Sequence, residues 1–242
     1  MNKKNTIIPS FRVIQPYRPG WTRALGFTLV EVLVVITIIA VLAIVSLSIA
    51  GKMRKAASSV VCVTKMRQIA SGIVLYTQDR GGRLPTSASY GSLFSGQGPW
   101  YNRDDRRLQS HIGEYLGAPV ATGWSTQAAL MTYDPSFAWP ELLKKGQKGS
   151  PSVALSSSVK LLINGVSQNG SAWNGSRPSG TGAYQGRRLD QIEEPNKAQA
   201  LIEVDQMNTN AGWKSLCPPD PIHGNYRNAL YFDWHIGRVP VK

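Results

Sequence analysis

The sequence predicts an α+β protein in which one long N-terminal helix packs on a small antiparallel β-sheet. Three observations support this prediction. Residues 32–50 form an uncharged apolar run, residues 62–76 repeat apolar side chains at helical spacing, and the C-terminal part contains short strand patterns that end in a hairpin pattern. A chain of 242 residues is long enough for one helix and a head, or at most for two small domains.

The run from Val32 to Ala50 has the length and composition of a membrane-spanning helix. It contains 19 residues and no charge, and its only polar side chains are Thr37, Ser46 and Ser48. About 20 apolar residues are needed to cross a bilayer, and a helix satisfies its own backbone hydrogen bonds there. Glu31 is a lone acid at the start of the run, which makes it a candidate functional residue. A helix that begins at Val32, with Glu31 among the lipid headgroups, is the simpler alternative.

Residues 1–26 form a basic leader with five Lys or Arg residues and no acid, whereas three basic residues follow the run at positions 52–55. The excess of positive charge keeps the leader cytoplasmic, so most of the chain is expected outside. Removing the leader lowers the net charge from +13 to +8. An ordinary secretory signal cleaved after Ala50 is a rival interpretation, although such signals have a shorter apolar core of about 7–15 residues.

The segment from Gly26 to Glu31, Gly-Phe-Thr-Leu-Val-Glu, resembles the processing site of type IV pilins and type II secretion pseudopilins. The resemblance implies that a prepilin peptidase cleaves after Gly26 and methylates the new N-terminus at Phe27, and that Glu31 serves filament assembly. A free amine at Phe27 and the carboxylate of Glu31 can neutralise each other between neighbouring subunits. The implied partners are the prepilin peptidase, other pilin or pseudopilin subunits and inner-membrane lipid.

The helix is expected to continue beyond Ala50 to about Arg80. Apolar side chains recur at steps of four and three residues along one face, and Gly81, Gly82 and Pro85 then end the helix. The face consists of Cys62, Met66, Ile69, Ile73 and Tyr76. The surrounding sequence is similar to a pseudopilin-like subfamily whose helix contains Cys-x-x-Asn-Leu-Arg-Gln-Ile. In this chain Lys65 stands in place of the asparagine.

These boundaries divide the chain into four parts. We expect a cleaved leader (1–26), the transmembrane half of the helix (27–50), the amphipathic half (51–80) and a periplasmic α+β head (81–242). Within the head, the patterns predict strands at Val159–Ile163 and Ala198–Val204, a short helix at His111–Leu116, and a strand or helix at Ala128–Tyr133. Cys62 and Cys217 allow one disulfide in an exported protein, although two separate buried thiols are favoured.

The C-terminal segment is similar to a His-x9-Asp-Gly signature that accompanies the same leader. The last part of this signature is usually Asn-x-x-Phe-x-Asp-Gly-His-Val. His223, Asn228, Asp233 and His235 match this signature, whereas Trp234 replaces the glycine. Asp-Gly favours a two-residue hairpin turn, and tryptophan disfavours the positive φ of that turn, so the turn type stays open.

The polar side chains of this signature allow two interpretations. In the first interpretation the cluster binds a metal ion, and its candidate ligands are His223, Asp233 and His235, with Glu203 and Asp205 on a neighbouring strand. In the second, which is favoured, the polar side chains form a hydrogen-bonded lock that closes the hairpin. Calcium is the ion that the resemblance allows, and no other cofactor is expected.

We therefore expect a structural subunit of a type IV pilus-like or type II secretion pseudopilus filament, not an enzyme. It is expected in the bacterial inner membrane as a single-pass protein, with a periplasmic head that joins an extracytoplasmic filament after assembly. No nucleophile motif or His-Glu-x-x-His motif favours hydrolysis.

Two alternatives remain. One is a membrane-anchored periplasmic enzyme or metal-binding module that uses His223, Asp233 and His235. The other is a DNA-binding uptake pilin, whose basic residues would contact phosphates. The candidate DNA patch consists of Trp100, Tyr101, Arg103, Arg106 and Arg107, and a solvated basic surface is the commoner explanation of such a group.

Overall fold

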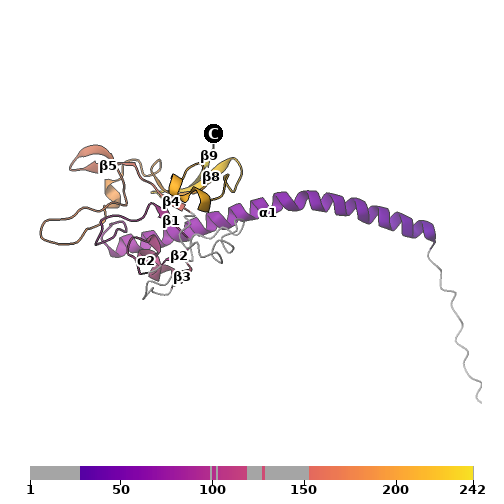
Figure 1. The fold of residues 1–242 in the computed structure, drawn as a ribbon, viewed down its shortest axis with the longest axis horizontal. Helices are drawn as coiled ribbons and strands as arrows, with labels where there is room; N and C mark the ends of the chain where they lie inside the picture. Colours follow the sequence, from indigo (N-terminus) through magenta and orange to yellow (C-terminus); the bar gives the residue numbers. More distant parts are fainter. Residues whose placement is uncertain (1–27, 99, 102, 119–126, 129–152, 242) are drawn as a thin grey trace, which may run out of the picture. The chain divides into compact units, whose positions relative to one another are not determined.

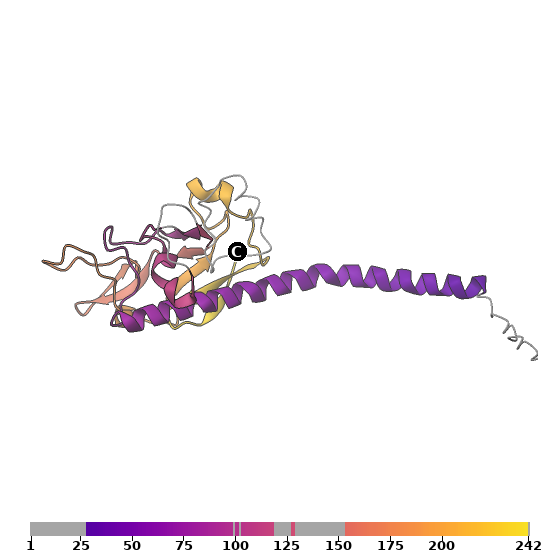
Figure 2. The ribbon, with the colours of Figure 1, turned by 90° about the horizontal axis from the view of Figure 1, so that it is seen from below.

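The structure is a computed structural model that describes residues 28–98, 100–101, 103–118, 127–128 and 153–241. It divides into two compact units, residues 1–48 and residues 49–242. Gly26 and Phe27 lie outside the described residues, as does most of the segment predicted as a strand or helix at 128–133. Figure 1 and Figure 2 show the elements from two directions.

Helix α1 runs from Leu29 to Asp79, which agrees with the predicted helix to within two residues at each end. Leu29–Ser46 is long and apolar enough to cross a membrane, and its large apolar side chains are exposed in the isolated chain. The helix ends because Gly81 adopts a left-handed conformation, with φ of 62°. The Gly82 N–H then donates to the Thr77 carbonyl at 2.7 Å, as in a Schellman cap.

The second half of α1 is amphipathic, as its spacing predicts. All five side chains of the predicted face are buried: Cys62, Met66, Ile69, Ile73 and Tyr76. Gln68 and Ser71, which lie off this face, are exposed. One stripe of the helix is therefore covered by the head, which is the usual arrangement when a helix contributes to a hydrophobic core.

The head contains a five-stranded sheet in the order β1-β4-β7-β8-β9, in which every neighbouring pair is antiparallel. The α+β fold predicted from the sequence is thus observed. Strand β7 lies within the predicted segment 198–204, and β8 and β9 form the predicted C-terminal hairpin. The strands are β1 (Gly96–Gln97), β4 (Val153–Leu155), β7 (Gln199–Glu203), β8 (Tyr226–Tyr231) and β9 (Ile236–Pro240).

A separate hairpin joins β5 (Val159–Ile163) to β6 (Val166–Gly170). The sequence predicts β5 but not β6, because β6 is exposed and polar and has no alternating pattern. The connecting residues are Asn164 and Gly165, with φ of 52° and 78°. Positive φ at both positions is the requirement of a type I′ hairpin turn, for which Asn-Gly is the preferred sequence.

The remaining elements are short. Strands β2 and β3 form a two-stranded antiparallel pair, and the predicted helix at 111–116 is replaced by α2 and the 3-10 helix η1. These elements are β2 (Trp100–Tyr101), α2 (Leu108–Ile112), η1 (Glu114–Leu116), β3 (Gln127–Ala128), η2 (Leu189–Gln191) and η3 (Ala211–Leu216).

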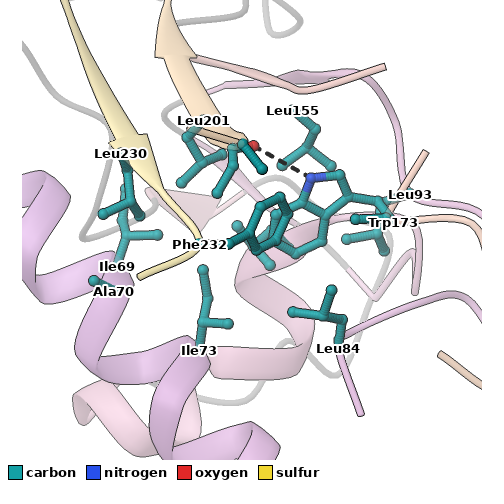
Figure 3. Packing of buried hydrophobic residues seen from close by; sticks show 14 of the residues in the cluster. Ile69, Ala70, Ile73, Leu84, Leu93, Leu155, Trp173, Leu201, Leu230 and Phe232 are labelled. Atoms are coloured by element: carbon teal, nitrogen blue, oxygen red, sulfur yellow. Dashed lines mark hydrogen bonds between the residues drawn. The ribbon is translucent and has the colours of Figure 1, made fainter. Parts of the chain in front are cut away.

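The core lies between α1 and the sheet. Figure 3 shows Ile69 and Ile73 of α1 pointing toward side chains from β8 and the turn that follows it. The Trp173 ring packs on Phe232 with centroids 5.6 Å apart. The Trp173 indole N–H donates to the Ala200 carbonyl at 3.2 Å, which satisfies its polar group inside the core.

Ile73→Ala tests this packing because the Ile73 side chain is 0% exposed in the core. We expect the free energy of unfolding of the head to fall by about 2–5 kcal/mol, since the substitution leaves a cavity. Urea unfolding of the full chain in detergent, followed by tryptophan fluorescence, measures this change. Leu75→Ala, two residues away and 42% exposed, is the control and should cost far less. Equal losses from the two variants would contradict the described helix face.

Candidate functional site

The start of α1 forms a reciprocal cap between Thr28 and Glu31. A Glu31 carboxylate oxygen accepts from the Thr28 backbone N–H at 2.8 Å and from the Thr28 hydroxyl at 2.9 Å. In return, the Glu31 backbone N–H donates to the Thr28 hydroxyl oxygen at 3.2 Å. This pattern is a capping box, in which a Thr and a Glu three residues later satisfy each other's unpaired backbone donors.

The cap corrects the alternative in which the helix begins at Val32 and Glu31 lies outside it. The helix begins at Leu29, and the Val32 N–H donates to the Thr28 carbonyl at 3.3 Å. Glu31 is therefore not an unpaired acid in the isolated chain. The Thr-x-x-Glu spacing is present in the sequence and is the signal that could have predicted this start.

The three candidate ligands of the C-terminal signature do not lie together. Asp233 and His235 belong to the turn between β8 and β9, where an Asp233 carboxylate oxygen lies 2.5 Å from His235 Nδ1 and accepts from the His235 backbone N–H at 3.2 Å. His223 precedes β8, so the length of that strand separates it from the turn. The proposed metal group of His223, Asp233 and His235 is therefore not formed, whereas Asp233 and His235 meet as a hairpin lock does.

The β8–β9 turn is a three-residue loop that ends with Trp234 in a left-handed conformation, with φ of 70°. The Tyr231 N–H donates to the His235 carbonyl at 3.0 Å, and the Trp234 N–H donates to the Tyr231 carbonyl at 3.0 Å. Such loops favour glycine at this last position. Tryptophan is tolerated because its ring packs against the core and meets Phe232 edge to face, with centroids 6.4 Å apart.

A buried polar cluster lies at the other end of β8, around Glu203. Asn228 donates to the Glu203 carboxylate twice, from its backbone N–H at 2.7 Å and from its side-chain amide at 3.0 Å. His223 Nε2 lies 3.1 Å from Glu203 Oε1, and its ring stacks on Tyr226. The structure thus brings Glu203 to His223, as the sequence anticipated, and adds Asn228 as the residue that holds the carboxylate.

Asp205, which the sequence offered as a candidate metal ligand, instead pairs with an arginine. Arg227 donates to both Asp205 carboxylate oxygens, at 2.6 and 2.9 Å, and the Asp205 side chain is 2% exposed. The Met207 N–H also donates to Asp205 at 2.8 Å. The sequence did not predict Arg227 in this role. The available signal was an arginine inside a predicted hairpin strand, together with a second predicted strand that ends near two acids, Glu203 and Asp205.

Cys62 and Cys217 are separate buried thiols and do not form the disulfide that the sequence allowed. Burial raises the pKa of the Cys217 thiol to about 11, so this thiol stays protonated near neutral pH. The interpretation of the two cysteines as buried small side chains therefore agrees with the structure.

Two arginines of the candidate DNA patch, Arg106 and Arg107, make contacts within the chain. Asp104 accepts two side-chain hydrogen bonds from Arg106, at 3.0 and 2.9 Å. The Arg106 guanidinium also lies 4.2 Å from the centres of the Tyr90 and Phe94 rings, and the Arg107 guanidinium lies 4.9 Å from that of Phe94. These arginines stabilise the loop before α2, which reduces the charge they can offer to phosphates.

A family profile described as a prokaryotic N-terminal methylation motif matches residues 21–47. The match includes Gly26, Phe27 and Glu31 and runs into the apolar part of α1. The chain therefore carries a prepilin-type N-terminus followed by a helix suited to membrane anchoring. This combination, joined to the α+β head, is consistent with a type IV pilin-like protein. Comparisons with curated proteins and with solved structures give no match to the chain.

Asp205→Asn tests the buried ion pair of the head. Loss of the charge leaves the Arg227 guanidinium without its ionic partner, so we expect the free energy of unfolding to fall by about 3–5 kcal/mol. Urea unfolding of the full chain in detergent measures the loss. The control is Asp190→Asn, because Asp190 pairs with Arg188 at an exposed position and should contribute no more than about 1 kcal/mol. Equal losses of unfolding free energy in the two variants would show that the buried Asp205–Arg227 pair stabilises the head no more than an exposed pair does.

Proposed function

We propose that this protein is a structural subunit of a type IV pilus-like or type II secretion pseudopilus-like filament, and not an enzyme. In this proposal a prepilin peptidase cleaves after Gly26 and methylates Phe27. The observation that carries it is the N-terminal methylation motif, which leads directly into a capped apolar helix with Glu31 in the cap.

The exposed apolar surface of residues 29–46 supports this proposal. A continuous apolar surface of this size needs lipid or other apolar helices around it. Before assembly, the inner membrane provides these surroundings, with the basic leader on the cytoplasmic side and the head outside. In a filament, the same surface packs against the helices of other subunits, through head-to-tail contacts that do not close into a ring.

The capping box suggests how Glu31 serves both states. In the monomer, hydrogen bonds from Thr28 satisfy the carboxylate and so lower the cost of holding an acid at the membrane. In the filament, the amine of Phe27 from a neighbouring subunit supplies the opposite charge. A buried charge that loses such a partner is strongly destabilised, so this pairing favours the correct axial position of each subunit.

The alternative functions receive less support. A hydrolytic or metal-dependent enzyme built on His223, Asp233 and His235 would need these side chains in one site, and β8 separates them. A DNA-binding uptake pilin would need Arg106 and Arg107 to face phosphates, yet both contact aromatic rings of the chain itself. Filament assembly needs neither arrangement.

The N-terminus of the mature protein tests the proposed processing. With a prepilin peptidase present, intact mass and terminal peptide sequencing should show loss of residues 1–26 and an N-methyl group on Phe27. We expect Gly26→Val to block cleavage because a β-branched side chain replaces the cleavage-site glycine, whereas Gly20→Val in the leader should leave it unchanged. A mature chain that starts at Gly51 would instead indicate an ordinary secretory signal.

Substitutions at the cap separate the charge of Glu31 from its role in helix capping. Glu31→Gln keeps the capping box but removes the charge, whereas Thr28→Ala weakens the cap and keeps the charge. If assembly depends on charge pairing, Glu31→Gln and Glu31→Ala should both reduce filament yield about tenfold or more, with normal membrane insertion. Sheared filaments and membrane fractions provide the measurement. A Glu31→Gln variant with wild-type yield would contradict the charge-pairing role, and Thr28→Ala should be the milder variant.

A further inference from the structure

Three side chains from distant parts of the sequence meet in the head. Cys62 lies on α1, Glu203 is the last residue of β7, and His223 precedes β8. The Cys62 sulfur, a Glu203 carboxylate oxygen and a His223 ring nitrogen all lie within 4.8 Å of one another. We propose that these three side chains form a binding site for a transition-metal ion of the zinc type.

The site is buried. Cys62 is 7% exposed, and the Glu203 and His223 side chains are 7% and 1% exposed. A carboxylate in such a place is costly unless an opposite charge lies beside it. A divalent ion bound by a thiolate, a carboxylate and a neutral imidazole carries no net charge as a group, so metal binding removes this cost.

The spacing of the donor atoms suits a tetrahedral ion. Zinc bonds to nitrogen, oxygen and sulfur of about 2.0–2.3 Å place neighbouring donor atoms about 3.3–3.6 Å apart. His223 Nε2 and Glu203 Oε1 are 3.1 Å apart, close to that separation. The Cys62 sulfur lies within 4.8 Å of both residues' donor atoms, so it closes the site by moving about 1 Å, which rotation of its side chain provides.

Two polar atoms at the cluster have no hydrogen-bond partner among the described residues. These atoms are His223 Nδ1 and Asn228 Oδ1, and both are buried. Unsatisfied buried polar atoms destabilise the folded state. Because the imidazole is hydrogen-bonded through only one nitrogen, its ring can adjust toward an ion. Asn228 Oδ1 belongs to the side chain that holds Glu203, and it can accept a hydrogen bond from a water in the fourth coordination position.

Contacts around the cluster position two of the three ligands. Asn228 fixes the Glu203 carboxylate with two hydrogen bonds. The Tyr226 ring stacks on His223 with centroids 5.5 Å apart, and its hydroxyl lies 3.1 Å from the Ser59 hydroxyl on α1. Such outer contacts orient the ligands of a metal site and strengthen binding.

The donor set selects the kind of ion. Thiolate and imidazole favour zinc and related transition metals, whereas calcium takes six to eight oxygen ligands. The calcium that the family resemblance allows is therefore not the ion that fits here. An ion in this position joins α1 directly to β7 and to the segment before β8, so metal binding is coupled to the folding of the head.

Cobalt and zinc titrations of the full chain test the proposal. The protein is purified in detergent without a histidine tag, reduced with a phosphine and stripped with a chelator. We expect about one equivalent of cobalt to produce a thiolate-to-cobalt charge-transfer band, and zinc to displace it and raise the unfolding temperature. Cys62→Ser should abolish this band, and His223→Gln should weaken binding about tenfold or more.

Matched controls assign the site. Cys217→Ser removes the other buried thiol, and His235→Gln removes the turn histidine, so both variants should bind cobalt as the wild type does. A wild-type chain that is folded by circular dichroism but gives no charge-transfer band overturns the proposal, whatever the variants do. Loss of the band in Cys217→Ser, or its retention in Cys62→Ser, overturns it as well. The test is independent of filament assembly, so its failure leaves the proposed function unaffected.

Discussion

The contact between one face of α1 and the antiparallel sheet is the interaction on which the head depends. Side chains from Cys62 to Tyr76 are buried on that face. Strand β8 and the turn that follows it lie against Ile69 and Ile73, and the Tyr76 ring meets the rings of His111 and Tyr115. Each large apolar side chain that becomes buried contributes about 1.5–3 kcal/mol. An isolated sheet of short strands is marginally stable without such a partner. The helix therefore provides the surface on which the head is built.

The same helix meets a second and different requirement before residue 46. There, apolar side chains are exposed on every side, and the acid at the start is held by its own capping box. The change from an all-apolar surface to a single apolar stripe suits one helix both to a membrane and to the hydrophobic core of the head. The polar groups of the head follow the usual rule for buried polar atoms: Asp205 pairs with Arg227, and Asn228 holds Glu203.

The parts of the fold that the sequence predicted are those with a local pattern. The period of α1, the short apolar island of β5, the apolar run of β7 and the C-terminal hairpin are each encoded in consecutive residues. The capping box is equally local, and it favours the predicted start near residue 27 over the alternative start at Val32. In contrast, β1 and β4 contain two and three residues, too few to show a period.

The site was harder to predict because its contacts are not local. His223 and Asp233 stand in one signature, and their common spacing suggested one site. Strand β8 separates them: His223 lies before the strand, beside Glu203, and Asp233 lies after it, beside His235. Cys62 joins the first of these through the packing of α1 on the sheet, which no spacing rule within the C-terminal segment contains. Such a juxtaposition depends on which strands pair and in what register. A long connection, not a tight turn that would fix the register, joins β7 to β8.

The order of the strands has a consequence for how the chain folds as it is synthesised. The hydroxyls of Ser59 and Tyr226 meet although 167 positions separate them, and Ile69 and Ile73 are covered by side chains of comparable sequence distance. Contacts of such long range form late, since the entropy of closing the intervening chain must be overcome first. Ile69 and Ile73 therefore lack this part of their cover from the time α1 is made until β8 is synthesised. During that interval these side chains form an exposed apolar surface that favours aggregation. Anchoring of residues 29–46 in a membrane would limit contact between copies of the chain.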